Sequence, residues 1–241
     1  MTTDELAGQI AIVTGGGSGI GAATAEALAR RGVHCVLVGR REDRLVAVEQ
    51  RLATPASHLA ADLTDDDAPA RIVERARTTH GRLDMIVHAA GVFDRRPLGE
   101  TDTDFWQPIL DLNLTATMAL TRESWADLGE SQGQVVLVSS AAALRGFPDN
   151  AAYAASKGGM NALGEVLREE GRALGIRVLT VCPAQTDTEL WDDQAPDEVR
   201  ARMMSAPGVG RLIAALVASD RSIDFAPIAI SPPIDPWTSG S

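Results

Sequence analysis

The sequence has little of several features, and each scarcity argues against a class of protein. It contains no uninterrupted run of about 18 apolar residues, so we expect no membrane-spanning helix. Basic residues are too few for a nucleic-acid binder, because 22 Lys and Arg face 33 Asp and Glu, a formal net charge of −11. The only two cysteines, Cys35 and Cys182, lie in apolar stretches, which favours buried thiols over a disulfide. Residues 1–9 are polar and acidic and lack the order of a secretory signal, so we expect a cytoplasmic protein.

Two residue types occur once each and lie close together. Tyr153 is the only tyrosine, and Lys157 is the only lysine; every other basic side chain apart from histidine is arginine. Residues four apart share one face of a helix. An ammonium beside a phenol favours the phenolate and lowers the tyrosine pKa from its usual value of about 10, toward the range of a general acid or base. An ordinary helical neighbour pair is the alternative, but a site that requires lysine would be the last to exchange it for arginine.

Apolar runs alternate with helical patterns along the whole chain. No internal repeat, linker or low-complexity segment interrupts them, so residues 1–241 are expected to form one domain. The pattern predicts an α/β fold of the Rossmann type, a single-domain doubly wound parallel sheet of about seven strands with helices on both faces. The predicted strands are 9–14, 33–38, 57–60, 83–88, 133–140, 177–182 and 224–230. Helices are predicted after Gly21 to residue 31, after Arg41 to residue 52, and at 66–79, 104–128, 150–174 and 209–218.

The first strand ends in a glycine run, Gly15-Gly-Gly-Ser-Gly-Ile-Gly21, followed directly by a helix. A strand, a glycine turn and a helix N-terminus together bind a diphosphate, because backbone N–H groups and the helix dipole face the anion. The glycines fit several spacings, so their position carries more weight than their pattern.

The end of the second strand indicates which dinucleotide binds. An Asp or Glu there usually holds a free ribose 2′-hydroxyl, whereas arginine suits a 2′-phosphate. Positions 39 and 40 carry no acid, and Arg40 and Arg41 precede Glu42. The sequence therefore favours NADP(H), with NAD(H) as the alternative if both arginines only begin a solvated helix face.

These motifs, taken in order, resemble the short-chain dehydrogenase/reductase family across essentially the whole chain. The matching elements are Thr14 through Gly21, Asp62, His88-Ala-Ala-Gly91, Asn113, Ser140, Tyr153-x-x-x-Lys157 and Pro183 through Thr188. Ser140 lies thirteen residues before Tyr153, the separation usual in the family, whereas Ser139 does not.

The resemblance implies roles for individual residues. Tyr153 would exchange the substrate proton, Lys157 would lower its pKa and bind the nicotinamide ribose, Ser140 would hold the carbonyl oxygen, and Asn113 would support a proton-relay water. The same resemblance, with the glycine turn and the strand-end arginines, gives an expected cofactor-binding set of Gly15, Gly17, Ser18, Gly19, Ile20, Gly21, Arg40, Arg41, Asp62, Leu63, Ala89, Ala90, Gly91, Tyr153, Lys157, Pro183, Thr186 and Thr188.

Three stretches depart from the family pattern. His88-Ala stands where the family has Asn-Asn, and we interpret His88 as a structural substitute and not a base. Pro183-Ala184 replaces a Pro-Gly pair. The glycine-rich end of the last strand is replaced by a proline-rich segment, so substrate closure and subunit contacts are expected to differ there.

The irregular stretch after Pro183 predicts a mobile substrate lid over about residues 184–208, and a flexible tail is expected over about 236–241. Loop position predicts a partly apolar pocket for a small to medium substrate, lined by Phe93, Leu144, Phe147, Trp191 and Met203.

The leading hypothesis is an NADP(H)-dependent oxidoreductase, a ketoreductase that interconverts a ketone and a secondary alcohol without a metal. Rival hypotheses are an NAD-dependent alcohol dehydrogenase, a 3-ketoacyl-thioester reductase, and a dinucleotide-binding sensor or scaffold without activity. The expected partners are a small carbonyl or alcohol substrate and further copies of the chain, as a dimer or homotetramer packed through the helices of Asn113 and Tyr153.

Overall fold

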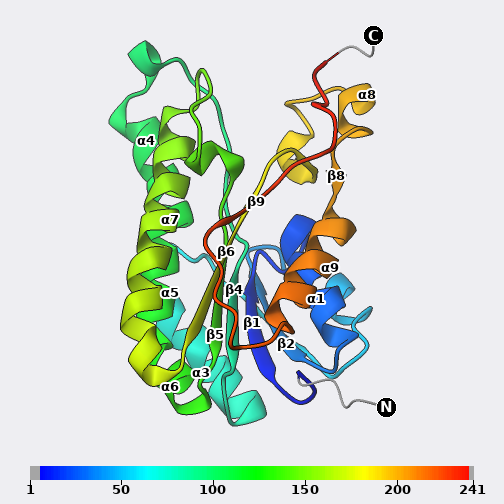
Figure 1. Ribbon diagram of the computed structural model, residues 1–241, viewed down its shortest axis with the longest axis vertical. Coiled ribbons are helices and arrows are strands. Elements are labelled where there is room, and N and C mark those ends of the chain that lie inside the picture. The colour runs from blue at the N-terminus through cyan, green and yellow to red at the C-terminus, as the bar shows by residue number, and fades with distance from the viewer. Residues whose placement is uncertain (1–5, 239–241) are drawn as a thin grey trace.

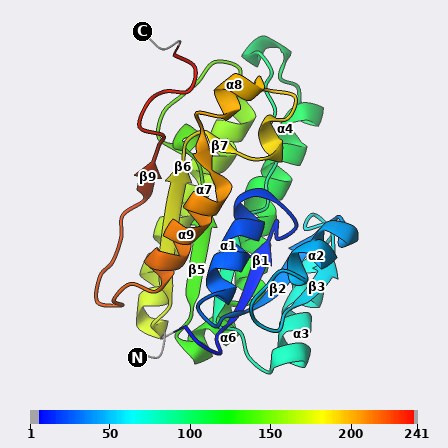
Figure 2. The same ribbon diagram turned by 90° about the vertical axis from the view of Figure 1, so that its right-hand side faces the viewer.

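The predicted strands form one parallel sheet. The computed structural model describes residues 6–238, and within them seven strands pair in the order β3-β2-β1-β4-β5-β6-β9 (Figures 1 and 2). This order places the chain reversal between β1 and β4, where doubly wound sheets bind their ligands. The strands are β1 (Ile10–Thr14), β2 (His34–Gly39), β3 (Ser57–Ala60), β4 (Met85–His88), β5 (Gln134–Val138), β6 (Arg177–Pro183) and β9 (Ile228–Ile230).

Helices cover both faces of the sheet, which confirms the predicted α/β architecture. Figure 1 shows α1 and α9 on one side of the sheet and α5 and α7 on the other. The helices are α1 (Gly19–Ala29), α2 (Glu42–Glu49), α3 (Ala68–His80), α4 (Thr103–Leu110), α5 (Ala116–Glu123), α6 (Trp125–Ser131), α7 (Ala151–Gly171), α8 (Asp197–Arg200) and α9 (Ala206–Val217). Short single turns lie at Leu98–Glu100, Ala141–Ala143, Arg172–Leu174 and Glu189–Trp191. No helix in the described residues is both long and apolar enough to cross a bilayer.

Each face of the sheet has its own apolar core. One core joins Leu28 of α1 and Ile213 of α9 to Val13 of β1, and the other joins Ile72 of α3 and Met160 of α7 to the opposite face. Alternate residues of a strand point to opposite faces, so a strand covered on both sides must be apolar throughout. All five residues of β1 and all five of β5 are buried, as this requires.

The predicted helix over 104–128 is wrong as a single element. A π-helical turn at Asp111–Thr115 separates α4 from α5, and Ser124 separates α5 from α6. Pro108 lies within α4 and removes one backbone donor there. Turns of the π type occur frequently at functional sites, and this one contains Asn113.

The last predicted strand and the predicted lid also differ from the structure. Pairing with β6 begins only at Ile228, directly after Pro227, which has no backbone donor for a ladder. The 184–208 stretch is not irregular throughout, because β7 (Thr186–Asp187) pairs with β8 (Met204–Ser205), α8 lies between them, and α9 already begins at Ala206. The predicted tail reaches beyond the described residues at 239–241.

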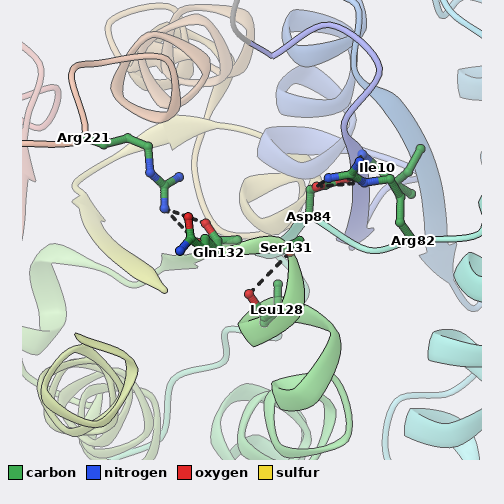
Figure 3. A network of polar contacts seen from close by, with 8 residues as sticks. Ile10, Arg82, Asp84, Leu128, Ser131, Gln132 and Arg221 are labelled. Carbon is green, nitrogen blue, oxygen red and sulfur yellow. Dashed lines mark hydrogen bonds and ion pairs between the residues drawn. The ribbon is translucent and has the colours of Figure 1, made fainter. Parts of the chain in front are cut away.

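Polar contacts close the end of the sheet at which the strands begin. The buried carboxylate of Asp84 accepts a hydrogen bond of 2.9 Å from the Ile10 backbone N–H and pairs with Arg82 at 2.5 Å. Figure 3 shows these contacts. Nearby, the Arg221 guanidinium donates to the backbone oxygen of Gln132 at 2.6 Å. These contacts satisfy backbone groups that the strand ladders leave unpaired.

Removing the Asp84 carboxylate is expected to destabilise the fold. Asp84→Ala would leave the buried Ile10 N–H without its partner, at a cost of about 1–3 kcal/mol in the free energy of unfolding by urea. Asp67→Ala is the matched control, because Asp67 is exposed and its ion pair with Arg71, 3.4 Å long, contributes at most about 1 kcal/mol. Equal losses in the two variants would contradict the role assigned to Asp84.

Candidate active site

The sequence-predicted site residues gather at the end of the sheet where β1, β4, β5 and β6 finish. Three adjoining cavities of about 170, 270 and 320 Å³ lie there. The two smaller cavities share Gly15, Ser18 and Arg41 in their walls, so they form one groove. Tyr153 lines both the 270 Å³ and the 320 Å³ cavity and therefore marks the junction between the groove and a separate pocket.

The glycine turn brings backbone close to backbone at the floor of the groove. Gly15 has φ +65°, and a Cβ there would lie 2.9 Å from the carbonyl carbon of Ala89. A Cβ on Gly21 would lie 2.3 Å from the oxygen of Gly15. Ser18 begins α1 without a side-chain cap, so its hydroxyl does not occupy the N–H groups of the first turn. The turn thus leaves an open cradle at a helix N-terminus.

Thr14 ties this turn to the loop after β4. Its hydroxyl accepts hydrogen bonds from the backbone N–H groups of Ala89 and Ala90, at 3.1 and 3.2 Å. Sequence reasoning quoted Thr14 within the motif but assigned it no role. The bond pattern explains why a short side chain with an acceptor is needed at the end of β1.

Three arginines stand along the far part of the groove. Arg40 and Arg41 line it as predicted, together with Arg44, which lies in the first turn of α2 and which sequence reasoning missed. Asp62 and Leu63 also line this part. Hydrogen bonds from the backbone N–H and the hydroxyl of Thr64 hold the pKa of Asp62 below its usual value.

Glu189 crosses from the segment after β6 to these arginines. Its carboxylate pairs with Arg41 at 2.6 Å and with Arg44 at 3.5 Å. Thr188 lies beside the turn as well, since a Cβ on Gly19 would be 3.3 Å from its methyl group. The segment after β6 therefore contacts both sides of the groove. Nothing in the sequence spacing indicated the contact to Arg41 and Arg44.

Tyr153 and Lys157 lie on one face of α7, as their spacing predicts. The Lys157 ammonium is 5.8 Å from the centroid of the Tyr153 ring and donates a hydrogen bond of 2.9 Å to the backbone oxygen of Val138. Lys157 is buried, with 4% of its surface exposed, whereas Tyr153 is half-buried against both cavities. The ammonium thus lies behind the phenol, inside the protein.

The pKa directions differ from the sequence-based expectation. Burial lowers the pKa of Lys157 to about 8, an effect that the Cys182 thiol partly opposes. Burial likewise raises the pKa of Tyr153, and a hydrogen bond with Ser140 acts the other way. Lys157 was expected to lower the tyrosine pKa, but its ammonium is directed at Val138, and desolvation favours the neutral form of each group. A neutral phenol is the form that can donate a proton.

The two serines after β5 have different surroundings. Ser140 accepts a hydrogen bond from the Ala142 backbone N–H at 3.1 Å and lines the 320 Å³ pocket with Tyr153. Ser139 is buried and donates to the backbone oxygen of Lys157 at 3.2 Å, which ties α7 to the end of β5. Ser139 lines this pocket too, so what distinguishes Ser140 is its hydrogen bond with Tyr153, and its catalytic role stays a prediction.

Asn113 is fully buried and does not line any of the three cavities. Its side chain accepts from the backbone N–H of Val92 at 2.9 Å, donates to the Val92 oxygen at 3.0 Å and donates to Ser156 at 3.1 Å. The π-helical turn therefore clamps the loop after β4 against α7. The Asn113 side chain thus fixes the Val92 backbone beside Ser156, and its part in a proton relay stays a prediction.

The pocket beyond Tyr153 has an aromatic wall. Phe93 lies 4.9 Å from the Tyr153 ring and 5.4 Å from Trp191, and Trp191 lies 6.3 Å from Trp237, all measured between centroids. Of the predicted pocket residues, Phe93, Phe147 and Trp191 line it, but Leu144 is exposed and Met203 is buried elsewhere. Pro183, Thr186 and Thr188 line it, and Trp237 of the tail was missed.

The short chain dehydrogenase family matches residues 9–199. The chain belongs to the short-chain dehydrogenase family. A 3beta-hydroxysteroid dehydrogenase of Mediterraneibacter gnavus is 33% identical over 207 residues, covering 84% of this chain and 75% of that protein. A cis-4-hydroxycyclohexanecarboxylate dehydrogenase of Sinomonas cyclohexanicum is 33% identical over 213 residues, covering 87% and 85%.

A solved structure shares the fold. The alcohol dehydrogenase of the archaeon Thermococcus sibiricus, complexed with 5-hydroxy-NADP, aligns with a TM-score of 0.85 at 20% identity, over 93% of this chain and 97% of that one. Family membership makes this short-chain dehydrogenase an oxidoreductase that acts on alcohols or ketones.

Members of the family typically use a nicotinamide dinucleotide, and the groove fits one. The uncapped start of α1 and the glycine cradle suit a diphosphate, and the arginine end suits an adenosine half. The other end of the groove reaches Tyr153 and Lys157, where a nicotinamide ribose would lie. Among the described residues no group of His, Cys, Asp or Glu could hold a metal ion.

His88, the departure from the family motif, contacts the interior and not the groove. Its Nε2 lies 2.9 Å from the Thr121 hydroxyl, which itself donates to the Thr117 backbone oxygen at 2.8 Å. Burial, with a further contribution from Lys157, lowers the pKa of His88 to about 3. A neutral ring in a hydrogen-bonded chain matches the structural role expected for it.

Lys157 should leave a signature in the pH dependence of stability. Its pKa falls from 10.5 to about 8 on folding, so between these values the unfolded chain binds more protons and the wild type gains stability as the pH rises. The unfolding free energy of the wild type minus that of Lys157→Met is expected to rise by about 3 kcal/mol over this interval. Tyr153 and Cys35 titrate in both proteins and cancel in the difference, and Cys182, whose pKa Lys157 lowers, is replaced by serine in both proteins. A flat difference, measured by urea unfolding, would contradict the burial of the charge.

Proposed function

We propose that the protein is an NADP(H)-dependent oxidoreductase that interconverts a ketone and a secondary alcohol. The observation that carries the proposal is the position of Tyr153, whose ring lines both the dinucleotide groove and the aromatic pocket. A carbonyl oxygen bound between Tyr153 and Ser140 would have a proton donor and a hydroxyl donor within one site. The bound cofactor would supply the hydride for the carbonyl carbon.

The proton would come from the Tyr153 phenol in the reductive direction. Burial keeps this phenol protonated, and the hydrogen bond with Ser140 favours the phenolate that forms when the proton leaves. Ser140 would orient the carbonyl oxygen. Ser139 and Asn113 act through the backbone, by holding α7 and the loop after β4 in register.

The choice of NADP(H) over NAD(H) rests on the charges at the end of β2. Arg40, Arg41 and Arg44 line that part of the groove, and Asp62 is the acid among its lining residues. The Asp62 carboxylate accepts hydrogen bonds from the backbone N–H and the hydroxyl of Thr64. The arginines are therefore available to bind a 2′-phosphate. The pairing of Glu189 with two of these arginines favours the rival, NAD(H), because it lowers the positive charge available.

The substrate is proposed to be an alicyclic or similarly sized ketone or alcohol. The two relatives described above are named for a hydroxysteroid and a hydroxycyclohexanecarboxylate. The aromatic wall and the 320 Å³ pocket suit such a body. Residues 184–208 would close over it as a lid, within a single domain that spans the chain. A 3-ketoacyl group on an acidic carrier protein is less favoured, because Arg168 and Arg172 already pair with Glu165 and Glu169.

We also propose that copies of the chain associate through α5 and α7, although fewer apolar side chains are exposed there than the sequence indicated. Of the apolar residues expected at such an interface, Ala116 is buried, and the core of the sheet takes up Leu120, Met160, Leu163 and Leu167 wholly or partly. Met118 and Val166 are exposed, by 38% and 52%. These two side chains support a dimer or tetramer contact. The free, buried cysteines fit the proposed cytoplasmic location.

Removing the phenol hydroxyl tests the proton donor. Tyr153→Phe is expected to lower kcat for ketone reduction by about 10²–10⁴-fold, because the serine hydroxyls that line the pocket are much weaker acids than the phenol. NADPH affinity, measured by fluorescence titration, should change little, since the groove keeps its glycine turn and arginines. Turnover at the wild-type rate would refute the assignment.

Glu189 tests the proposed cofactor preference. In Glu189→Gln the two arginines lose a competing carboxylate, so the Kd for NADPH should fall about two- to fivefold, the worth of an exposed ion pair. The Kd for NADH should change less, because NADH brings no phosphate to this place. Glu165→Gln, an exposed carboxylate on the far part of α7, is the control. Equal effects on the two cofactors would favour NAD(H).

A further inference from the structure

The pocket beyond Tyr153 carries charge of a sign opposite to that of the whole protein. Arg95, in the loop after β4, and Arg145, after the turn at Ala141–Ala143, both line it. The chain as a whole has a net charge of −11. A cleft that reverses the sign of the surrounding protein attracts an ion of the opposite charge and raises its local concentration.

Both guanidinium groups are held over aromatic rings and have no acidic partner among the described residues. The Arg95 guanidinium carbon lies 5.6 Å from the Phe93 centroid and 5.9 Å from the Trp191 centroid. Its Nε donates to the amide oxygen of Gln194 at 3.2 Å. The Arg145 guanidinium carbon lies 4.7 Å from the Phe147 centroid. Stacking fixes a guanidinium and leaves N–H groups of its fork available to a ligand.

The acid in the lining does not neutralise the two arginines. Asp235 is the acidic residue among the described residues of this pocket, and its carboxylate accepts the Trp237 backbone N–H at 3.1 Å. It forms no ion pair with Arg95 or Arg145 within the described part of the chain. Asp94, next to Arg95 in sequence, accepts from the Arg95 backbone N–H and not from its side chain. The lining therefore keeps an excess of positive charge.

The arginines stand at a suitable place relative to the reacting group. Tyr153 contacts Phe93 at 4.9 Å, and Phe93 contacts Arg95 at 5.6 Å, so one aromatic ring separates the proton donor from the cation. A substrate with its carbonyl at Tyr153 and its body along the aromatic wall would extend toward Arg95 and Arg145. A guanidinium binds a carboxylate there through two parallel hydrogen bonds.

We infer that the substrate is a carboxylate-bearing ketone, or the corresponding hydroxy acid, whose carboxylate binds Arg95 and Arg145 across a ring-sized apolar body. This rests on the proposed ketone reduction at Tyr153 and adds the chemical class of the substrate. The reaction is unchanged: hydride adds to the carbonyl carbon, the oxygen takes the tyrosine proton, and the carboxylate does not react.

The test compares 4-acetylbenzoate with 4-acetylbenzamide, two ketones of the same shape of which only the first is charged. With NADPH, the wild type should have a kcat/KM about tenfold higher for the acid, the worth of a charge-assisted hydrogen bond to a guanidinium. Arg95→Gln and Arg145→Gln should each reduce this ratio, and the double variant should bring it close to one. Arg122→Gln, on α5 and outside the pocket, should keep the wild-type ratio. Because the readout is a ratio, a general loss of activity from disturbing the aromatic wall does not imitate the effect.

The outcomes separate the two proposals. Equal turnover of acid and amide by the wild type, or a preference that survives in the double variant, overturns the carboxylate site and leaves ketone reduction intact. Faster reduction of acetoacetyl-coenzyme A than of either ring ketone would also overturn it. That probe has no carboxylate, and its phosphates lie far from its ketone group. If no ketone is reduced, the proposed function fails. The carboxylate site is then tested by calorimetric binding of 4-acetylbenzoate and of 4-acetylbenzamide to Tyr153→Phe with NADP⁺. Tighter binding of the acid, lost in the arginine variants, supports it, and equal binding refutes it.

Discussion

The site depends on keeping one ammonium ion inside the protein. Lys157 is the only lysine, it is buried, and it faces a strand-end carbonyl and not a carboxylate. Removing a cation from water is costly, and a single neutral acceptor offsets the cost only in part, which is why the pKa of Lys157 falls to about 8. The fold must therefore supply stability elsewhere, and it does so through two fully formed apolar cores on the faces of the sheet. Arginine could not take this position in the same way, because its planar guanidinium has five donors to satisfy, whereas a compact ammonium faces one backbone oxygen here.

The groups around Lys157 are fixed by buried hydrogen bonds to backbone. Ser139 binds the Lys157 carbonyl, Thr14 binds the loop after β4 from one side, and Asn113 binds it from the other. Each of these residues contacts main chain from a different element. As a result β1, β4, β5 and α7 are joined directly beneath the groove. The π-helical turn follows from the same requirement, since it places the Asn113 amide beside Val92.

Much of this could be predicted from sequence, because the relevant signals are local. Apolar runs bounded by glycine and polar residues indicated all strands of the sheet, and a spacing of four placed Tyr153 and Lys157 on one face. The π-helical turn was missed because the apolar pattern of residues 104–128 continues across it. Two further contacts were missed because they join segments that are far apart in the chain. They are the ion pair of Glu189 with Arg41 and the presence of Trp237 in the pocket wall. The sequence could not predict that the pKa of Tyr153 is raised, because the shift depends on the burial of the phenol and on the orientation of the Lys157 ammonium.

The two sides of the groove are held by interactions of different strength. Beneath the groove, the contacts are buried hydrogen bonds, each costly to leave unmade, so α7, which carries Tyr153, keeps its position. Above it, the segment after β6 is held by exposed ion pairs, from Glu189 to Arg41 and from Arg200 to Asp187 and Asp192. Such pairs contribute at most about 1 kcal/mol each and weaken with salt. In the proposed function the segment after β6 covers a bound dinucleotide, and a cover held by exposed pairs would open at smaller cost than the floor of the groove. The distribution of buried and exposed polar contacts in this chain supports that proposal.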